Sequence, residues 1–153
     1  MKIDIEKGIV DFGIIKVCRT TKHEEFDALS GKLVTRAVTK KGSYFYYFIS
    51  PIVKEGIPMN ITIFFSYKEN RSPTIEFRPY VTGNCIAVFN AGHKWMENVL
   101  NDRIYISNSM NNCNYQLYPY FKIRTSTICI TSETGYHPIY EIEYGGTIDI
   151  KFE

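Results

Sequence analysis

The sequence has little of what metal sites, disulfide scaffolds and nucleotide-binding loops are built from. It contains no Cys-x-x-Cys pair and no cysteine–histidine group at zinc-ligand spacing. The Gly-x-Ser-x-Gly, Gly-x-Gly-x-x-Gly and phosphate-loop patterns are also missing. We therefore expect no bound metal, no cofactor and no catalytic residue, and we interpret the four cysteines as free buried thiols: Cys18, Cys85, Cys113 and Cys129.

Long apolar runs and excess charge are lacking too. No run approaches the ~18 apolar residues of a membrane span, and the amino terminus, MKIDIEK, alternates charged with apolar residues, unlike a signal peptide. These features predict a cytoplasmic protein with no membrane partner. A net charge of +2 is too small for the clustered basic face of a nucleic-acid-binding domain, so nucleic acid is not the expected partner.

Histidine is scarce, with only His23, His93 and His137 in the chain. Each could act as a general base near neutral pH. However, His23 and His93 fall at expected helix starts and His137 falls in a turn before Pro138. We therefore expect structural histidines and no enzymatic activity.

What the chain does have is aromatic residues in alternating patterns. Aromatics make up 15% of it, including 12 tyrosines, which favours strands. In 139–144 apolar residues alternate with Glu141 and Glu143, and in 147–152 with Asp149 and Lys151. If these two strands pair so that apolar residues face apolar residues and Glu141 faces Lys151, the loop at Gly145-Gly146 must contain an odd number of residues.

The region 33–81 is organised as strands joined by turn sequences. Glycine, proline, asparagine and lysine cluster at 40–42, 55–58 and 70–73, which divides the region into four strands. Short connections between consecutive strands predict an antiparallel meander. A further strand is expected over 11–17, and a closing strand pair over 127–130 and 138–144.

Two short helices complete the prediction. Thr21 and Glu24 have capping-box spacing ahead of Phe26, which predicts a short helix. Apolar residues recur at helical spacing within 85–100 and include the lone Trp95. Asn90 is a candidate cap, and an earlier start remains open. The sequence therefore predicts one α+β domain over 1–153, mostly an antiparallel meander with two short helices.

The third and fourth predicted strands of the meander each have one apolar face and one face that mixes polar and apolar residues. Ile61, Ile63 and Phe65 alternate with Thr62 and Phe64, and the strand at 74–79 repeats the pattern. Side chains on the mixed face point away from the core, and tyrosine is frequent in protein interfaces. The candidate partner-binding residues are Phe64, Glu76, Arg78 and Tyr80.

The order of these segments resembles small immunity proteins encoded beside bacterial polymorphic toxins, including those of contact-dependent growth inhibition. The segments that carry the resemblance are Asp11-Phe12-Gly13, residues 21–26 leading into a helix, the strands 60–67 and 74–79, and the closing pair 127–130 and 138–144. The resemblance implies a cytoplasmic bacterial protein without enzymatic activity that binds one cognate toxin domain and occludes its active site. Neither the toxin's activity nor an oligomeric state follows from it.

Two other functions remain open on the sequence alone. One is a small-molecule-binding protein or enzyme, with a pocket between the sheet and the Trp95 helix and a histidine or Cys113 taking part. The other is single-strand RNA binding through Tyr44 and Tyr46, because 41–48 resembles the strand motif of RNA recognition domains. In that motif Ser43 stands where a base-stacking aromatic is needed.

Overall fold

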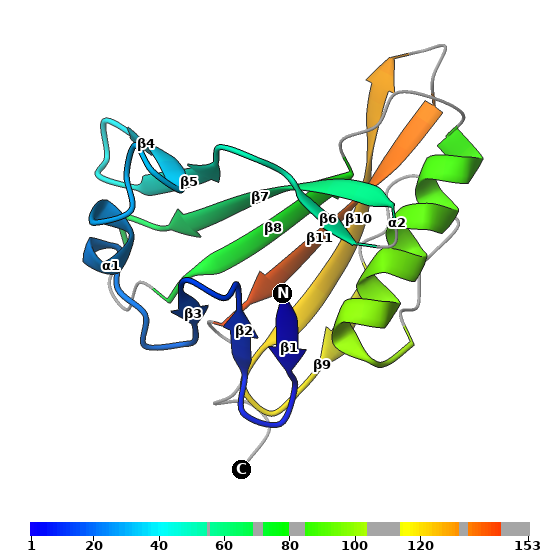
Figure 1. The fold of residues 1–153 in the computed structure, drawn as a ribbon, viewed down its shortest axis with the longest axis horizontal. Helices are drawn as coiled ribbons and strands as arrows, with labels where there is room; N and C mark the ends of the chain where they lie inside the picture. The colour runs from blue at the N-terminus through cyan, green and yellow to red at the C-terminus, as the bar shows by residue number, and fades with distance from the viewer. Residues whose placement is uncertain (55, 69–71, 80–84, 104–113, 132–134, 145–153) are drawn as a thin grey trace.

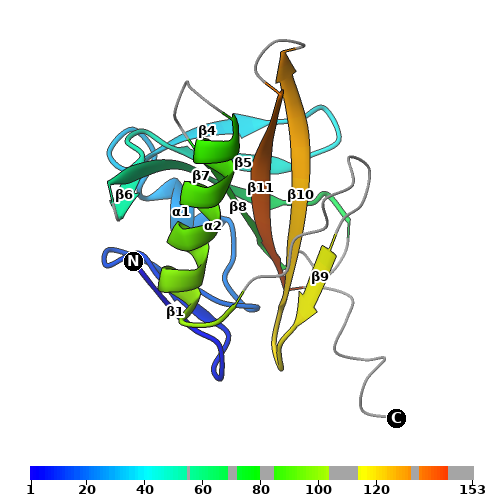
Figure 2. The same ribbon diagram turned by 90° about the vertical axis from the view of Figure 1, so that its right-hand side faces the viewer.

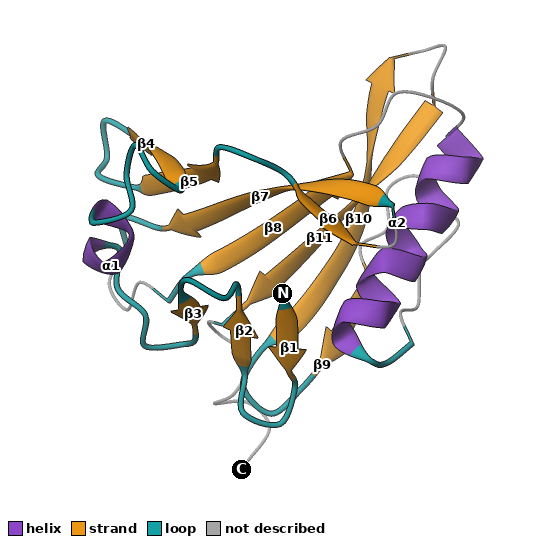
Figure 3. Ribbon diagram, viewed as in Figure 1, coloured by secondary structure: helices purple, strands orange, loops and turns teal. Residues whose placement is uncertain are grey.

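The computed structural model describes residues 1–54, 56–68, 72–79, 85–103, 114–131 and 135–144. Within these ranges the chain forms an eight-stranded antiparallel sheet, a separate three-stranded sheet and two helices (Figure 1, Figure 3). The predicted α+β class, dominated by antiparallel strands, is confirmed.

The small sheet is built at the amino terminus from β1 (Lys2–Asp4), β2 (Ile9–Asp11) and β3 (Lys16–Val17). The single strand predicted over 11–17 is wrong, because the chain turns between β2 and β3. Gly13 has a φ of 89°, and its N–H donates to Asp11 Oδ1 at 2.7 Å. This side-chain-stabilised turn ends β2 and returns the chain as β3.

The large sheet has the strand order β4-β5-β7-β8-β11-β10-β9, and β6 also pairs with β7. The meander is confirmed through β8, although the second predicted strand is divided into β5 and β6. Its strands are β4 (Val34–Val38), β5 (Tyr44–Phe48), β6 (Ile52–Lys54), β7 (Ile57–Phe65), β8 (Thr74–Pro79), β9 (Asn114–Leu117), β10 (Lys122–Thr131) and β11 (Gly135–Glu143).

The carboxyl-terminal half of the described chain adds three strands to the free edge of β8. The predicted closing pair is confirmed, with Thr127 opposite Pro138 in the β10–β11 ladder. Strand β11 then pairs with β8 and places Ile142 opposite Ile75. The loop at Gly145-Gly146, the strand at 147–152 and the candidate residue Tyr80 lie outside the described residues.

The first helix, α1 (Glu24–Asp27), forms where it was expected but without the predicted capping box. Thr21 Oγ1 instead accepts the N–H of Cys18 at 2.9 Å, and Glu25 Oε2 accepts the N–H of Lys22 at 2.7 Å. His23 precedes the helix and makes no side-chain cap. The Thr21 hydroxyl is therefore used by the turn that leads into the helix.

The second helix, α2 (Cys85–Leu100), is confirmed over the range in which it was expected, with 16 residues. Asn90 lies inside it and is not its cap. As expected, Trp95 is fully buried, with its ring centroid 5.7 Å from that of Phe77 on β8. This contact fixes α2 on the face of the sheet that carries Phe77.

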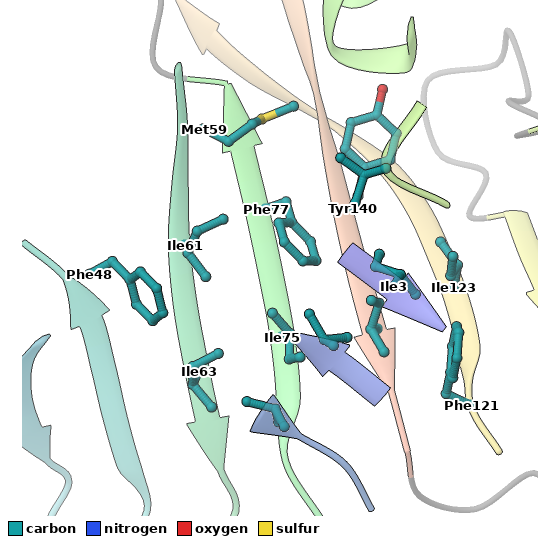
Figure 4. Packing of buried hydrophobic residues seen from close by; sticks show 14 of the residues in the cluster. Ile3, Phe48, Met59, Ile61, Ile63, Ile75, Phe77, Phe121, Ile123 and Tyr140 are labelled. Carbon is teal, nitrogen blue, oxygen red and sulfur yellow. The ribbon is translucent and has the colours of Figure 1, made fainter. Parts of the chain in front are cut away.

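Both helices and the small sheet lie on one face of the large sheet, which we call the core face. Helix α2 contacts β1, β7, β8 and β11 (Figure 2), and Phe26 of α1 packs on Tyr46 of β5. Figure 4 shows Ile61, Ile63, Ile75 and Phe77 side by side on β7 and β8, with Ile3 of β1 farther along the same face, toward Ile123 of β10. The opposite face, the outer face, is covered by neither helix nor by the small sheet.

Candidate protein-binding surface

Three of the four predicted binding residues lie together on the outer face. The β7–β8 register places Phe64 opposite Thr74 and Asn60 opposite Arg78, with Glu76 between them on β8. The core-face residues of both strands are buried, so this set faces away from the core. The side chain of Arg78 keeps 47% of its surface exposed and that of Glu76 keeps 25%.

A pocket of about 510 Å³ opens on the outer face beside these residues. It forms where β7 exchanges one neighbour for another: β5 pairs with β7 as far as Tyr47 opposite Thr62, and β6 takes over with Ile52 opposite Met59. Its lining residues are Phe45, Tyr47, Phe48, Asn60, Ile61, Thr62, Glu76 and Arg78.

The sequence missed most of this lining. Alternation along β7 puts Asn60 and Thr62 on the same face as Phe64, which was a usable signal. The role of Tyr47 depends on the break between β5 and β6, which no local pattern reveals.

Aromatic side chains form one wall of the pocket. The rings of Phe45 and Phe64 lie 4.6 Å apart, and those of Phe45 and Tyr47 are stacked with centroids 6.1 Å apart. Tyr47 is 44% exposed, and the next residues toward β6 include Ile49 and Val53, which are also exposed. An accessible apolar strip therefore borders the pocket on the β5–β6 side.

Paired charges fill the middle of the outer face. Arg78 Nη2 donates to Glu76 Oε2 at 3.3 Å, and Arg124 Nη1 donates to Glu141 Oε1 at 3.3 Å. A third pair joins Lys122 Nζ to a carboxylate oxygen of the last β11 residue, Glu143, at 3.0 Å. The expected charge ladder along β11 is present with Arg124 and Lys122 as partners, whereas Lys151 lies outside the described residues.

Glu141 is the most enclosed member of this ladder. Its side chain is only 17% exposed, and burial raises the pKa of its carboxyl group. The nearby Arg124 opposes this change, while the carboxylates of Glu76 and Glu143 add to it. The face therefore holds a partly desolvated carboxylate beside two others.

The far side of the outer face is apolar again. Tyr115 and Leu117 on β9 are 51% and 46% exposed, and the ammonium group of Lys122 lies 4.9 Å from the ring centroid of Tyr115. Charged pairs in the middle of the face are thus flanked by exposed apolar side chains on both sides.

The ring of His23 and the hydroxyl group of Tyr46 make contacts inside the fold. The ring of His23 stacks on Tyr44 at 3.9 Å, and Asp27 Oδ1 accepts the Tyr46 hydroxyl at 2.8 Å. Tyr46 is fully buried on the core face, so it does not offer the stacking surface that RNA binding would require. These contacts hold α1 to β5.

Cys18 is a free, partly exposed thiol. Burial acts to raise its pKa, but hydrogen bonds to Thr20 and Thr21 outweigh burial and lower it. Cys113 lies outside the described residues. Within the described ranges, no group of three His, Cys, Asp or Glu residues is arranged to hold a metal ion.

We found no match to this chain among protein-family models, curated proteins or solved structures. The described part of the chain also contains no helix that is long and apolar enough to span a membrane.

Proposed function

We propose that this protein is an immunity-type inhibitor, which binds a cognate bacterial toxin domain through the outer face of its large sheet and occludes the toxin's active site. In this proposal it acts in the cytoplasm, has no enzymatic activity and needs no cofactor. The observation that carries the proposal is the outer face itself. It combines a pocket, exposed aromatic residues and paired charges on a face that neither helix covers.

The composition of this face suits protein binding. Stable interfaces bury about 800 Å² per partner and depend most on aromatic and arginine side chains in desolvated pockets. Tyr47 and Arg78 line the pocket and remain exposed, so a partner can bury both. Their strands, β5 and β8, each pair with a neighbour on both sides, so the backbone that carries them is already ordered and the ordering cost of binding is lower.

A small-molecule enzyme is less well supported by the same pocket. It lies on the outer face and not between the sheet and α2, where an enzyme site was considered. The described residues that line it include no histidine and no cysteine. The carboxylate of Glu76 is held by Arg78, so the pocket lacks an unpaired general base.

The test is binding to the toxin domain encoded next to this protein's gene, typically the variable carboxyl-terminal domain of a large secreted protein. The two purified proteins should form a complex, and the toxin domain should lose its activity in it. Tyr47→Ala and Arg78→Glu should each weaken binding by at least about tenfold, the size expected for an interface hot spot.

Matched substitutions away from the outer face serve as controls. Tyr67→Ala removes a tyrosine that is 41% exposed, close to the 44% of Tyr47. Arg19→Glu reverses an exposed charge next to β3, on the side of the small sheet. Both should leave affinity within about twofold. Full affinity in Tyr47→Ala and Arg78→Glu would rule out the outer face as the binding site.

A further inference from the structure

The pocket on the outer face is electrically balanced. Among the described residues that line it, Glu76 and Arg78 are the charged ones, and they neutralise each other through two hydrogen bonds. The adjacent Glu141 is likewise paired with Arg124. A cation entering the pocket would be repelled by Arg78, and an anion by Glu76, with no unpaired opposite charge to compensate either. Charge complementarity therefore favours a neutral occupant.

Two polar side chains in the lining have unused hydrogen-bonding capacity. Asn60 is exposed and Thr62 is partly exposed, and neither side chain has a hydrogen-bond partner among the described residues. An amide and a hydroxyl can both donate and accept. They lie across from the aromatic wall of Phe45 and Tyr47, so one side of the pocket is apolar and the other polar.

We propose that the pocket receives a tyrosine side chain of the partner protein, with its ring against Tyr47 and its hydroxyl group bonded to Asn60 and Thr62. A tyrosine is neutral, presents a large flat ring and has a tip that both donates and accepts a hydrogen bond. Leucine would leave the two polar groups unpaired, and arginine would add an uncompensated charge. This inference rests on the proposed function, because it names the anchor of the same interface.

The experiment titrates the full-length ¹⁵N-labelled protein with N-acetyl-tyrosine amide and follows its backbone amide signals. Saturable shifts should centre on Tyr47, Asn60 and Thr62, with a dissociation constant of about 1 mM, as expected for a ligand of this size. N-acetyl-arginine amide and N-acetyl-leucine amide should bind at least about fivefold more weakly at these positions.

Variants separate the pocket from general aromatic binding. Tyr47→Ala should abolish the saturable shifts, and Thr62→Val, which keeps shape but removes the hydroxyl, should weaken them severalfold. Tyr115→Ala should leave them unchanged, because Tyr115 lies on β9 at the other side of the outer face. If Tyr47→Ala does not keep the wild-type amide spectrum, Tyr47→Leu takes its place.

Three outcomes would overturn the inference: tighter binding of the arginine amide, equal binding of the leucine amide, or shifts that survive Tyr47→Ala. None of them bears on whether the protein inhibits a toxin. If the toxin complex forms and depends on Arg78 while the tyrosine amide does not bind, the proposed function stands and the tyrosine anchor is wrong. If the tyrosine amide binds but no toxin complex forms, the proposed function is wrong, and the pocket remains a site for a tyrosine side chain of a different partner protein.

Discussion

Glu76 and Glu141 lie directly opposite each other on neighbouring strands of the outer face. Like charges in this position destabilise a sheet. The arrangement is tolerated because each carboxylate has its own arginine: Arg78 follows two residues after Glu76 on β8, and Arg124 lies opposite Glu141 on β10. A like-charge pair on an accessible face breaks a local rule of sheet stability, and such exceptions are typical of surfaces that serve binding. The free-energy cost of the Glu141 charge can be measured by removing that charge.

Glu141→Gln should stabilise the protein at pH 7 by about 0.5–1 kcal/mol, the usual size for one partly exposed charge. Burial and the neighbouring carboxylates raise the pKa of Glu141 in the folded protein above its unfolded value of 4.5. The stability linked to its protonation is therefore present below pH 4.5 and is lost as the pH rises through the folded pKa. Glutamine carries no charge and avoids that loss.

Urea unfolding of the wild type and of Glu141→Gln between pH 4 and pH 7 tests whether the Glu141 charge lowers the free energy of unfolding. The advantage of Glu141→Gln should shrink toward zero on acidification. A variant that is less stable than the wild type at pH 7 would mean that the Arg124 ion pair outweighs burial and repulsion. Glu6→Gln, which removes one negative charge at an exposed position in the β1–β2 turn, controls for the same change in net charge.

Gly8→Ala should destabilise the protein more than Gly31→Ala. Both glycines have positive φ, 67° and 81°, so alanine is strained at either position by about 1–2 kcal/mol. A Cβ at Gly8 would also lie 2.5 Å from Cβ of Tyr120, whereas one at Gly31 would meet nothing within 4 Å. Chemical unfolding of the two variants measures the contact by difference. Equal losses would show that the β1–β2 turn does not pack on Tyr120.

Tyr46→Phe should destabilise the protein, whereas Tyr140→Phe should not. The Tyr46 hydroxyl donates to Asp27 Oδ1, and its removal should cost about 1 kcal/mol. The Tyr140 hydroxyl is buried beside Gly92 and has no hydrogen-bond partner among the described residues. Its removal should be neutral or stabilising, because no bond is lost and a buried polar group is removed. Thermal unfolding of the two variants compares them directly.

The core was predictable from the sequence because it follows local periodicity. Alternation along β7 and β8 correctly separates Ile61 and Ile75 from Glu76 and Arg78, since a strand turns every second side chain to the same face. The helix that carries Trp95 was found by its spacing for the same reason. These patterns need no knowledge of which strands pair.

The pocket was not predictable because it depends on pairing between distant segments. Tyr47 reaches the pocket only because β5 ends there and β6 replaces it along β7. Glu141 meets Glu76 only because β11 adds to the edge of β8. The capping-box prediction was also wrong, although it concerned residues close together in the sequence. The Thr21 hydroxyl accepts the N–H of Cys18 instead of an N–H of the helix.

The protein should lose stability steeply above pH 10, and three tyrosines should keep their protons until it unfolds. Burial raises the pKa of Tyr46, Tyr140 and Tyr144 above the ordinary 10, with Asp27, Glu97 and Cys18 adding to the effect at the respective sites. For a pKa raised in the folded state, the contribution to stability is complete below pH 10 and is lost as the pH climbs toward the folded value.

Ultraviolet titration of tyrosinate should therefore show a late step that coincides with loss of the far-ultraviolet circular dichroism. Tyr140→Phe should make that late step smaller, because it removes one of the three hydroxyl groups whose pKa is raised. Smooth ionisation of all tyrosines while the circular dichroism stays constant would contradict the burial of these three hydroxyl groups.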